Sequence, residues 1–168
     1  KPHRDEKVIT AWNGLMLAAF AEAAAILGSS EYLDTAVRNA EFLMENLVTD
    51  GRMLRTWKDG RGKLNGYIED YANLADGLIA LYQVTGEARY LEEARRLADV
   101  MLSEFWDDDN GGFFFTSGDH ESLLARPKDP YDGALPGANS MAALDLMALH
   151  RATREGRYLD EARKTLEA

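Results

Sequence analysis

The sequence contains no cysteine, three histidines and no cluster of basic residues. Without cysteine, neither disulfides nor thiolate metal sites can form, and three histidines do not favour a multi-histidine metal centre. The formal net charge of −10 opposes binding to nucleic acid and to anionic membrane surfaces, which both require positive charge. We therefore expect no metal, no cofactor, no nucleic acid and no membrane as partners, and the lack of cysteine fits a cytoplasmic protein.

Long apolar runs are also scarce. The longest, 18–27, contains Glu22 and is too short to span a bilayer, and residues 1–7 lack the apolar region of a signal peptide. The 168 residues fit one domain, 1–168. Because the chain opens without methionine and ends within a helical pattern, we expect it to be a fragment of a longer protein.

A repeated motif organises the chain. Residues 85–94 read TGEARYLEEA and return at 153–162 as TREGRYLDEA, and more loosely at 28–36 as GSSEYLDTA. The motif tyrosines are 58 and then 68 residues apart. Each copy follows an apolar segment and opens a charged one, which predicts a helical hairpin with a tight turn as the repeating unit.

Apolar and charged helical segments alternate along the chain. Segments 10–27, 70–85 and 139–152 are largely apolar, whereas 31–47 and 89–105 place apolar residues at helical spacing among charges. Two layers account for this alternation, with the apolar helices inside and the charged helices outside. The sequence therefore predicts an all-α fold of about three helical hairpins.

The connections between helices are unequal in length. Turns within a hairpin take about three residues, whereas the connections between hairpins run over 48–69 and 107–138. All the long connections should therefore lie at one end, the rim where the inner helices begin. Each opens with a glycine turn and a short apolar run, at 50–57 and 110–116, which predicts a little β-structure there. Long loops of this kind often carry function.

Three motifs lie at this rim: ITAWNGLM at 9–16, GYIEDYA at 66–72 and RPKDPYDGALPGANS at 126–140. They resemble the spermatogenesis-associated, thioredoxin-like-domain protein family. The resemblance implies an (α/α)6 toroid similar to six-hairpin glycosidases and N-acylglucosamine 2-epimerases, preceded in full-length relatives by a thioredoxin-like domain. It also implies that this chain is about half of the toroid and that its partner is the remainder of the parent chain.

The resemblance does not extend to the histidines with which such epimerases transfer protons. His3, His120 and His150 all lie outside the three motifs. We expect His120 and His150 to be ordinary packed or surface residues.

Three carboxylates are the candidate catalytic residues. Glu69 and Asp70 open the second inner helix, and Asp132 precedes the third. Each can act as an acid or base on a sugar, or can cap a helix or close a turn, and both readings stay open. The helix dipole is expected to lower the pKa of a carboxylate at a helix start, which suits a base or nucleophile. Glycoside hydrolysis needs two carboxyls about 5–10 Å apart, and one of the first pair with Asp132 fits that role.

Aromatic, amide and charged residues of the same motifs and loops are candidates for sugar binding. Aromatic rings suit the faces of sugars and amides suit their hydroxyls, although such residues also pack and cap helix ends. The candidate substrate-binding residues are Trp12, Asn13, Trp57, Tyr71, Arg126, Lys128, Asp129 and Asn139.

These features favour a carbohydrate-active domain that binds or processes a small sugar at the rim, as a hydrolase or an isomerase. The alternative is a non-catalytic structural or protein-interaction module of a larger protein. Because half a ring leaves the first and last helices uncovered, self-association through these helices is also expected.

Overall fold

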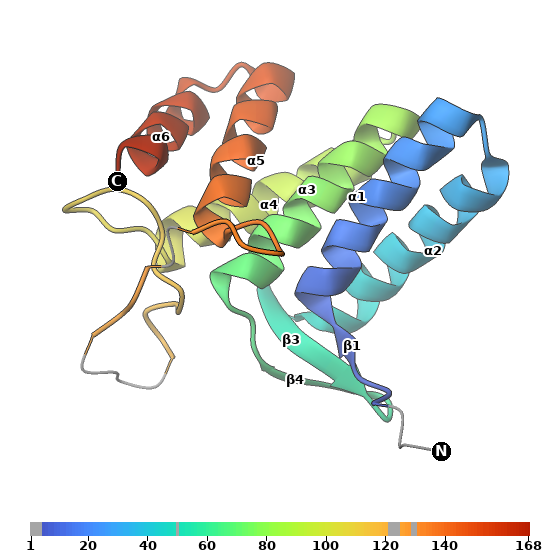
Figure 1. Cartoon of the computed structure of the whole chain (residues 1–168), viewed down its shortest axis with the longest axis horizontal. Helices are drawn as coiled ribbons and strands as arrows, with labels where there is room; N and C mark the ends of the chain where they lie inside the picture. The colour runs from blue at the N-terminus through green and yellow to red at the C-terminus, as the bar shows by residue number, and fades with distance from the viewer. Residues whose placement is uncertain (1–4, 50, 121–124, 129–130) are drawn as a thin grey trace.

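A computed structural model describes residues 5–49, 51–120, 125–128 and 131–168. In these segments six helices form three hairpins, and short strands lie at the rim (Figure 1). The helices are α1 (Thr10–Leu27), α2 (Ser30–Leu47), α3 (Ile68–Thr85), α4 (Ala88–Glu104), α5 (Ala138–Thr153) and α6 (Gly156–Glu167). The strands are β1 (Val8–Ile9), β2 (Val48–Thr49), β3 (Arg52–Lys58) and β4 (Arg61–Asn65). The predicted all-α fold with short β-structure is confirmed.

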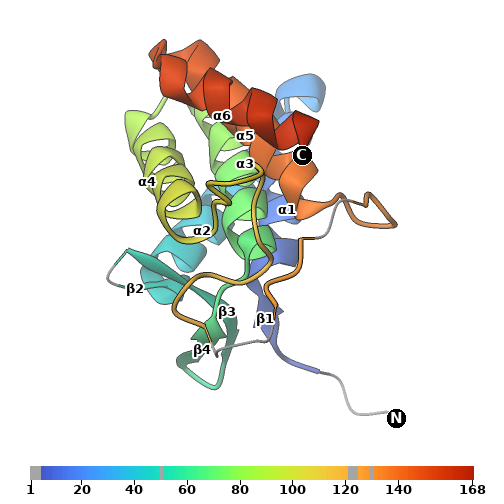
Figure 2. The ribbon, with the colours of Figure 1, turned by 90° about the vertical axis from the view of Figure 1, so that its left-hand side faces the viewer.

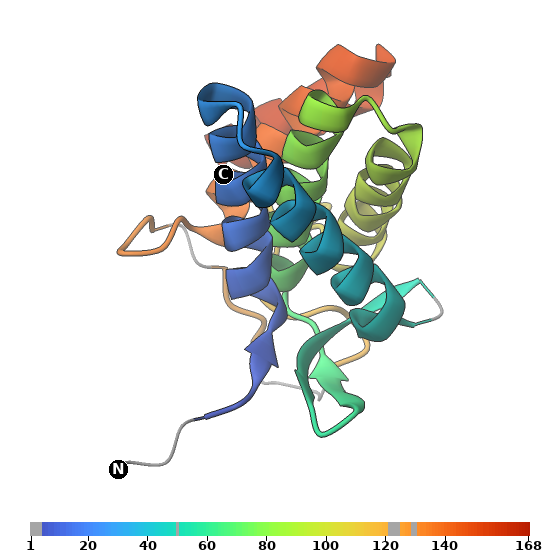
Figure 3. The ribbon, with the colours of Figure 1, turned by 90° about the vertical axis from the view of Figure 1, so that its right-hand side faces the viewer.

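The helices form the two expected layers. Helix α3 packs against both α1 and α5, and each outer helix, α2, α4 and α6, packs on the inner helix of its own hairpin. Twelve of the 18 residues of α3 are buried, compared with four of 18 in α2. Figures 2 and 3, which view the molecule from opposite sides, show α3 at the centre of this arrangement.

The long connections gather at one end, as the sequence predicted. Strand β3 is central to the first connection: it pairs antiparallel with β1, β2 and β4, and the register joins Val8 to Trp57 and Val48 to Met53. In the second connection an antiparallel β-bridge joins Trp106 to Phe113. Both connections lie where the inner helices begin, while the tight turns lie at the opposite end (Figure 1).

Helix α1 is buried along only one side. Its Trp12, Met16, Ile26 and Leu27 are exposed, on the side away from the core. At 18 residues, α1 is longer than its apolar run indicated, and within the described residues it is the one helix long and apolar enough to cross a membrane. Its inner-layer position against α3 accounts for that apolar composition.

Two glycines allow α1 and α3 to approach closely. A Cβ atom at Gly14 would lie 2.5 Å from the carbonyl carbon and oxygen of Asn73, and one at Gly77 would lie 2.8 Å from the carbonyl oxygen of Gly14. These neighbours are backbone atoms of packed helices, so they cannot turn aside as a flexible side chain would. The contact therefore requires glycine at both positions.

We expect G14A to lower the free energy of unfolding by about 1–3 kcal/mol, because the added methyl group forces the two helices apart. This cost outweighs the roughly 1 kcal/mol that alanine gains over glycine inside a helix. The matched control is G156A at the start of α6, where a Cβ atom would meet nothing within 4 Å. Denaturant unfolding followed by circular dichroism measures both, and equal stability of the two variants would contradict the packing argument.

Candidate functional site

Asp70 ties together the starts of the first two inner helices. It is the third residue of α3, it is fully buried, and its Oδ2 accepts the N–H of Tyr67 at 2.9 Å. Its Oδ1 accepts the N–H of Ala11 in α1 at 3.0 Å, and Oδ2 lies 3.2 Å from Nη1 of Arg55. One carboxylate thus caps α3, holds the first turn of α1 and pairs with β3.

The protonation of Asp70 differs from the sequence expectation. Burial raises its pKa to about 6, while the N–H of Tyr67, the Arg55 guanidinium and the N–H of Ala11 act in the opposite direction. A lowered pKa was expected from the helix dipole, and for Asp70 that expectation is wrong. The reason is that the loss of water around a fully buried carboxylate outweighs the favourable dipole and hydrogen bonds.

Glu69, the neighbouring residue, lies at a more open position. Its side chain is 30% exposed, and its Oε1 lies 2.7 Å from Nη1 of Arg55. The Arg55 guanidinium lies 4.6 Å from the centre of the Tyr67 ring, and this ring stacks on Phe115 from the second long connection at 4.6 Å. A partly exposed carboxylate, a guanidinium and an aromatic stack therefore share one part of the rim.

His120 joins this group, although sequence reasoning set it aside as an ordinary residue. Its ring centre lies 5.4 Å from that of Tyr67, and its Nδ1 lies 2.6 Å from Oγ of Ser117. Its Nε2 is buried and has no partner within the described part of the chain. Asp119 accepts from Ser117 and pairs with Arg52 at 2.7 Å, and these contacts lower the pKa of Asp119.

The third candidate catalytic residue, Asp132, lies at the start of α5. Its Oδ1 accepts the N–H of Gly137 at 2.6 Å, and its Oδ2 accepts the hydroxyl of Ser140 at 3.0 Å. The side chain thus caps α5 from the preceding loop. The ion pairs of Glu69 and Asp70 converge on Arg55, whereas the hydrogen bonds of Asp132 lead to the start of α5.

The predicted binding residues of the second connection hold that connection in place. Asn139 exchanges two hydrogen bonds with the backbone of Phe113, at 2.7 and 3.0 Å. Arg126 donates to the carbonyls of Glu104 and Thr116. Lys128 lies 2.7 Å from Asp107. Asp129 falls outside the described residues.

Of the predicted residues in the first two motifs and β3, Trp12 alone presents a largely exposed ring. Trp57 is half-buried and edge-on to Phe42. The Tyr71 hydroxyl is buried and accepts the N–H of Met53 at 2.8 Å, and burial raises the pKa of Tyr71. Asn13 joins the carbonyl of Ile9 to the side chain of Asn39.

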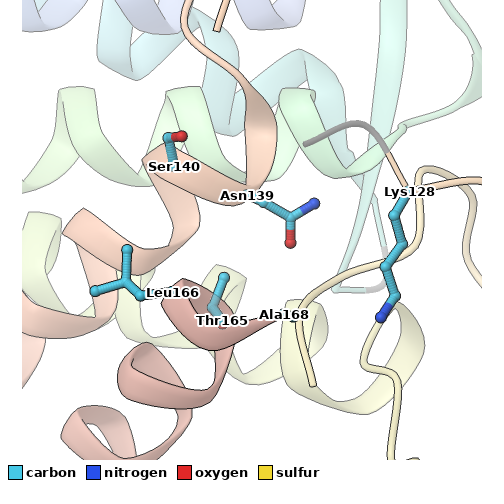
Figure 4. Close-up of a pocket in the computed structure, with 6 residues that line it drawn as sticks. All are labelled: Lys128, Asn139, Ser140, Thr165, Leu166 and Ala168. Carbon is cyan, nitrogen blue, oxygen red and sulfur yellow. The ribbon is translucent and has the colours of Figure 1, made fainter. Parts of the chain in front are cut away.

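A pocket of about 380 Å³ opens between the second connection and the hairpin of α5 and α6 (Figure 4). Its lining residues are Lys128, Asn139, Ser140, Thr165, Leu166 and Ala168. Two predicted binding residues, Lys128 and Asn139, therefore face a cavity, although their polar groups also hold the loop. Across the described ranges, no three His, Asp or Glu side chains are arranged to hold a metal ion.

Each inner helix also carries a carboxyl group further along its length: Glu22 on α1, Asp76 on α3 and Asp145 on α5. Asp145 is 1% exposed, and neither of its oxygens has a hydrogen-bond partner in the described segments. Burial, followed by the charge of Asp76, raises the pKa of Asp145 well above its usual value. Burial and the charge of Glu22 raise the pKa of Asp76 to about 6. The folded state therefore favours a neutral Asp145.

No protein-family model matches the sequence. The chain is 38% identical to spermatogenesis-associated protein 20 of Homo sapiens and of Rattus norvegicus, in an alignment 172 positions long that covers 96% of the chain. It is homologous to a segment of spermatogenesis-associated protein 20. The resemblance inferred from the three rim motifs is thus confirmed. The chain spans 22% of the length of these relatives, and it is also 29% identical to an uncharacterized protein of Caenorhabditis elegans.

Several solved structures with the same fold carry the names of sugar-processing enzymes. A cellobiose 2-epimerase from Bacillus thermoamylovorans matches with a TM-score of 0.80 and 14% identity, over 98% of this chain and 44% of the other. A D-mannose isomerase matches with a TM-score of 0.75 and 20% identity, over 95% of this chain and 39% of the isomerase. A family 76 mannosidase from Bacteroides thetaiotaomicron matches with a TM-score of 0.74 and 19% identity, over 96% of this chain and 44% of the mannosidase. At these identities the likeness shows the fold, and the predicted (α/α) toroid architecture is confirmed.

We expect D145N to be more stable than the wild type at neutral pH. The raised pKa of Asp145 means that protonation supports folding fully below the usual value of 3.8, and that this support is lost as the pH rises. Asparagine keeps the shape and does not titrate, so the difference in melting temperature should grow between about pH 4 and pH 8. D34N, at an exposed position of α2, is the control. A D145N protein that melts below the wild type across this range would contradict the assignment.

Proposed function

We propose that the rim of this chain is part of a carbohydrate site, in which Glu69 acts as an acid or base on a neutral sugar. One observation carries the proposal: the partly exposed Glu69 is held by Arg55 beside the stacked rings of Tyr67 and Phe115. Proteins named as a mannose isomerase, a cellobiose epimerase and a mannosidase share the fold, which supports a sugar as the ligand.

The chemistry of this group suits a sugar. An aromatic surface attracts the apolar face of a sugar ring, while a carboxylate and a guanidinium bind its hydroxyls. In an isomerase, Glu69 would take the proton from the carbon beside the sugar carbonyl, and Arg55 would stabilise the enediolate oxygen. In a hydrolase, a second carboxyl such as Asp132 would have to lie about 5–10 Å away across the scissile bond. We favour the isomerase, because the Glu69–Arg55 pair supplies both of the groups that it needs.

The other candidate residues take supporting roles in this proposal. Asp70 positions Arg55 and the first turn of α1, and Asp132 positions the first turn of α5. Trp12 is the exposed ring that remains available for a sugar at the start of α1. Lys128 and Asn139 line the neighbouring pocket.

A second candidate function is a non-catalytic interaction module. It is favoured by a specific observation: most polar groups of the rim already have structural partners. Asp70, Asp132 and Asn139 bind backbone N–H groups, and Lys128 binds Asp107. A rim that holds itself together in this way can serve as a stable surface without any reaction.

Titration calorimetry with neutral sugars, including mannose and cellobiose, separates the two functions. The sugar hypothesis predicts measurable heat with at least one of them, and an affinity for E69Q that is lower by on the order of tenfold, because a charged hydrogen-bond acceptor is lost. The matched control is E104Q. Glu104 also pairs with an arginine of β3, Arg52, at 3.2 Å, and its side chain is 35% exposed.

If E69Q and E104Q lost sugar affinity equally, Glu69 would have no specific role in sugar binding. An absence of heat with every sugar, for a protein that melts cooperatively, would favour the interaction module.

A further inference from the structure

The repeated turn motif opens each outer helix in the same register. Arg89 is the second residue of α4, and Arg157 is the second residue of α6. The second residue of α2 is Glu31. Two copies of the motif therefore place an arginine before the tyrosine, whereas the first copy places a carboxylate there.

Each of these arginines binds the preceding outer helix. Nη2 of Arg89 lies 3.1 Å from Glu41 on α2, and Nη2 of Arg157 lies 2.8 Å from Asp99 on α4. Glu41 and Asp99 both lie nine residues after the motif tyrosine of their own helix. The same ion pair thus joins neighbouring hairpins twice, at equivalent positions.

Further contacts distinguish these junctions from an open end. At the second junction, Arg95 of α4 lies 2.5 Å from Glu155, the residue before α6. The motif tyrosines Tyr90 and Tyr158 are 0% exposed, whereas Tyr32 in the first copy is 36% exposed. A hairpin packed on the preceding one therefore buries its motif tyrosine.

Helix α6 repeats the acceptor positions of α4. Glu167 lies nine residues after Tyr158, as Asp99 does after Tyr90, and Arg163 stands at the position equivalent to Arg95. Both Glu167 and Arg163 are exposed. Within the segments that the structure describes, neither has an ion-pair partner.

The inner helix beside α6 is open on the corresponding side. Leu144 and Met147 lie nine and six residues before the end of α5, and Ala18 and Ala21 occupy the same places in α1. The two alanines are buried in the core, whereas Leu144 is exposed and lines, with Met147, an apolar pocket of about 320 Å³. An apolar surface therefore accompanies the two free charges.

We propose that Leu144, Met147, Arg163 and Glu167 form a docking surface for one more helical hairpin of the same repeat, whose outer helix opens with Glu-x-Arg-Tyr. The arginine of that turn binds Glu167, its glutamate binds Arg163, and its inner helix covers the two apolar residues. Charge complementarity at the two internal junctions is the basis for this choice of partner.

The first hairpin of a second copy lacks this turn. It opens with Ser-Ser-Glu-Tyr at 29–32, so a head-to-tail contact between copies would set Glu31 against Glu167. Like charges at such a position oppose association. The surface therefore selects for the arginine form of the motif and against the chain's own first copy.

A charge-swap series in the full chain, followed by sedimentation velocity over a range of concentrations, tests the proposal. E31R gives the first hairpin the arginine of the motif, which then faces Glu167 of a second copy. E167R instead places the positive charge on α6, where it faces Glu31. Each single variant should associate head to tail, with a dissociation constant lower than that of the wild type by on the order of tenfold, because attraction replaces repulsion. The double variant E31R/E167R restores like charges and should return to the wild-type behaviour.

E45R is the matched control, since Glu45 is also an exposed acidic residue of α2 and the net charge changes equally. Association of E45R to the same extent as E31R would overturn the proposal. So would equal association of the wild type and both single variants, or a double variant that associates as strongly as the single ones.

Discussion

The contact between α1 and α3 is the constraint on which the rest of the structure depends. Gly14 and Gly77 bring the two backbones together, and Asp70 fastens the first turn of α1 to the first turn of α3. These interactions act at different points along the same pair of helices, so they fix both the separation and the register of the helices. With the starts of both helices held level, the connections that precede them emerge at one end. The rim is therefore a consequence of inner-layer packing.

Much of the fold could be read from the sequence because it rests on local patterns. The alternation of apolar and charged segments gives the two layers, and the unequal connections place the rim. The candidate site could be predicted only in outline. Glu69 was recognised at a helix start, but its partner Arg55 lies on a strand whose pairing depends on contacts distant in sequence. His120 lies in a polar loop without periodicity, so no pattern could reveal that it reaches Tyr67. The pKa of Asp70 depends on complete burial, which a helix-start motif does not specify.

The rim shows why a carboxylate at a helix start is ambiguous in sequence. Asp70 and Glu69 are adjacent and share the same arginine, yet one is fully buried and the other is partly exposed. Asp70 meets the starts of two helices and a strand, so its replacement would disturb all three at once. Glu69 pairs with Arg55 and keeps a partly exposed side chain, so its carboxylate stays accessible from solvent. The difference in packing, rather than in residue type, leaves Asp70 in structural contacts and Glu69 with a partly exposed carboxylate.

The inner and outer layers join neighbouring hairpins through different interactions. The inner layer supplies apolar burial, which is strong but tolerates sliding because it has little directional preference. The outer layer supplies ion pairs, which are individually weak at partly exposed positions but require particular atoms to meet. Their repetition nine residues after Tyr32 and after Tyr90 therefore contributes register more than stability. Tyr90 and Tyr158 are both buried at junctions where this ion pair forms, so close packing and alignment of the hairpins occur together.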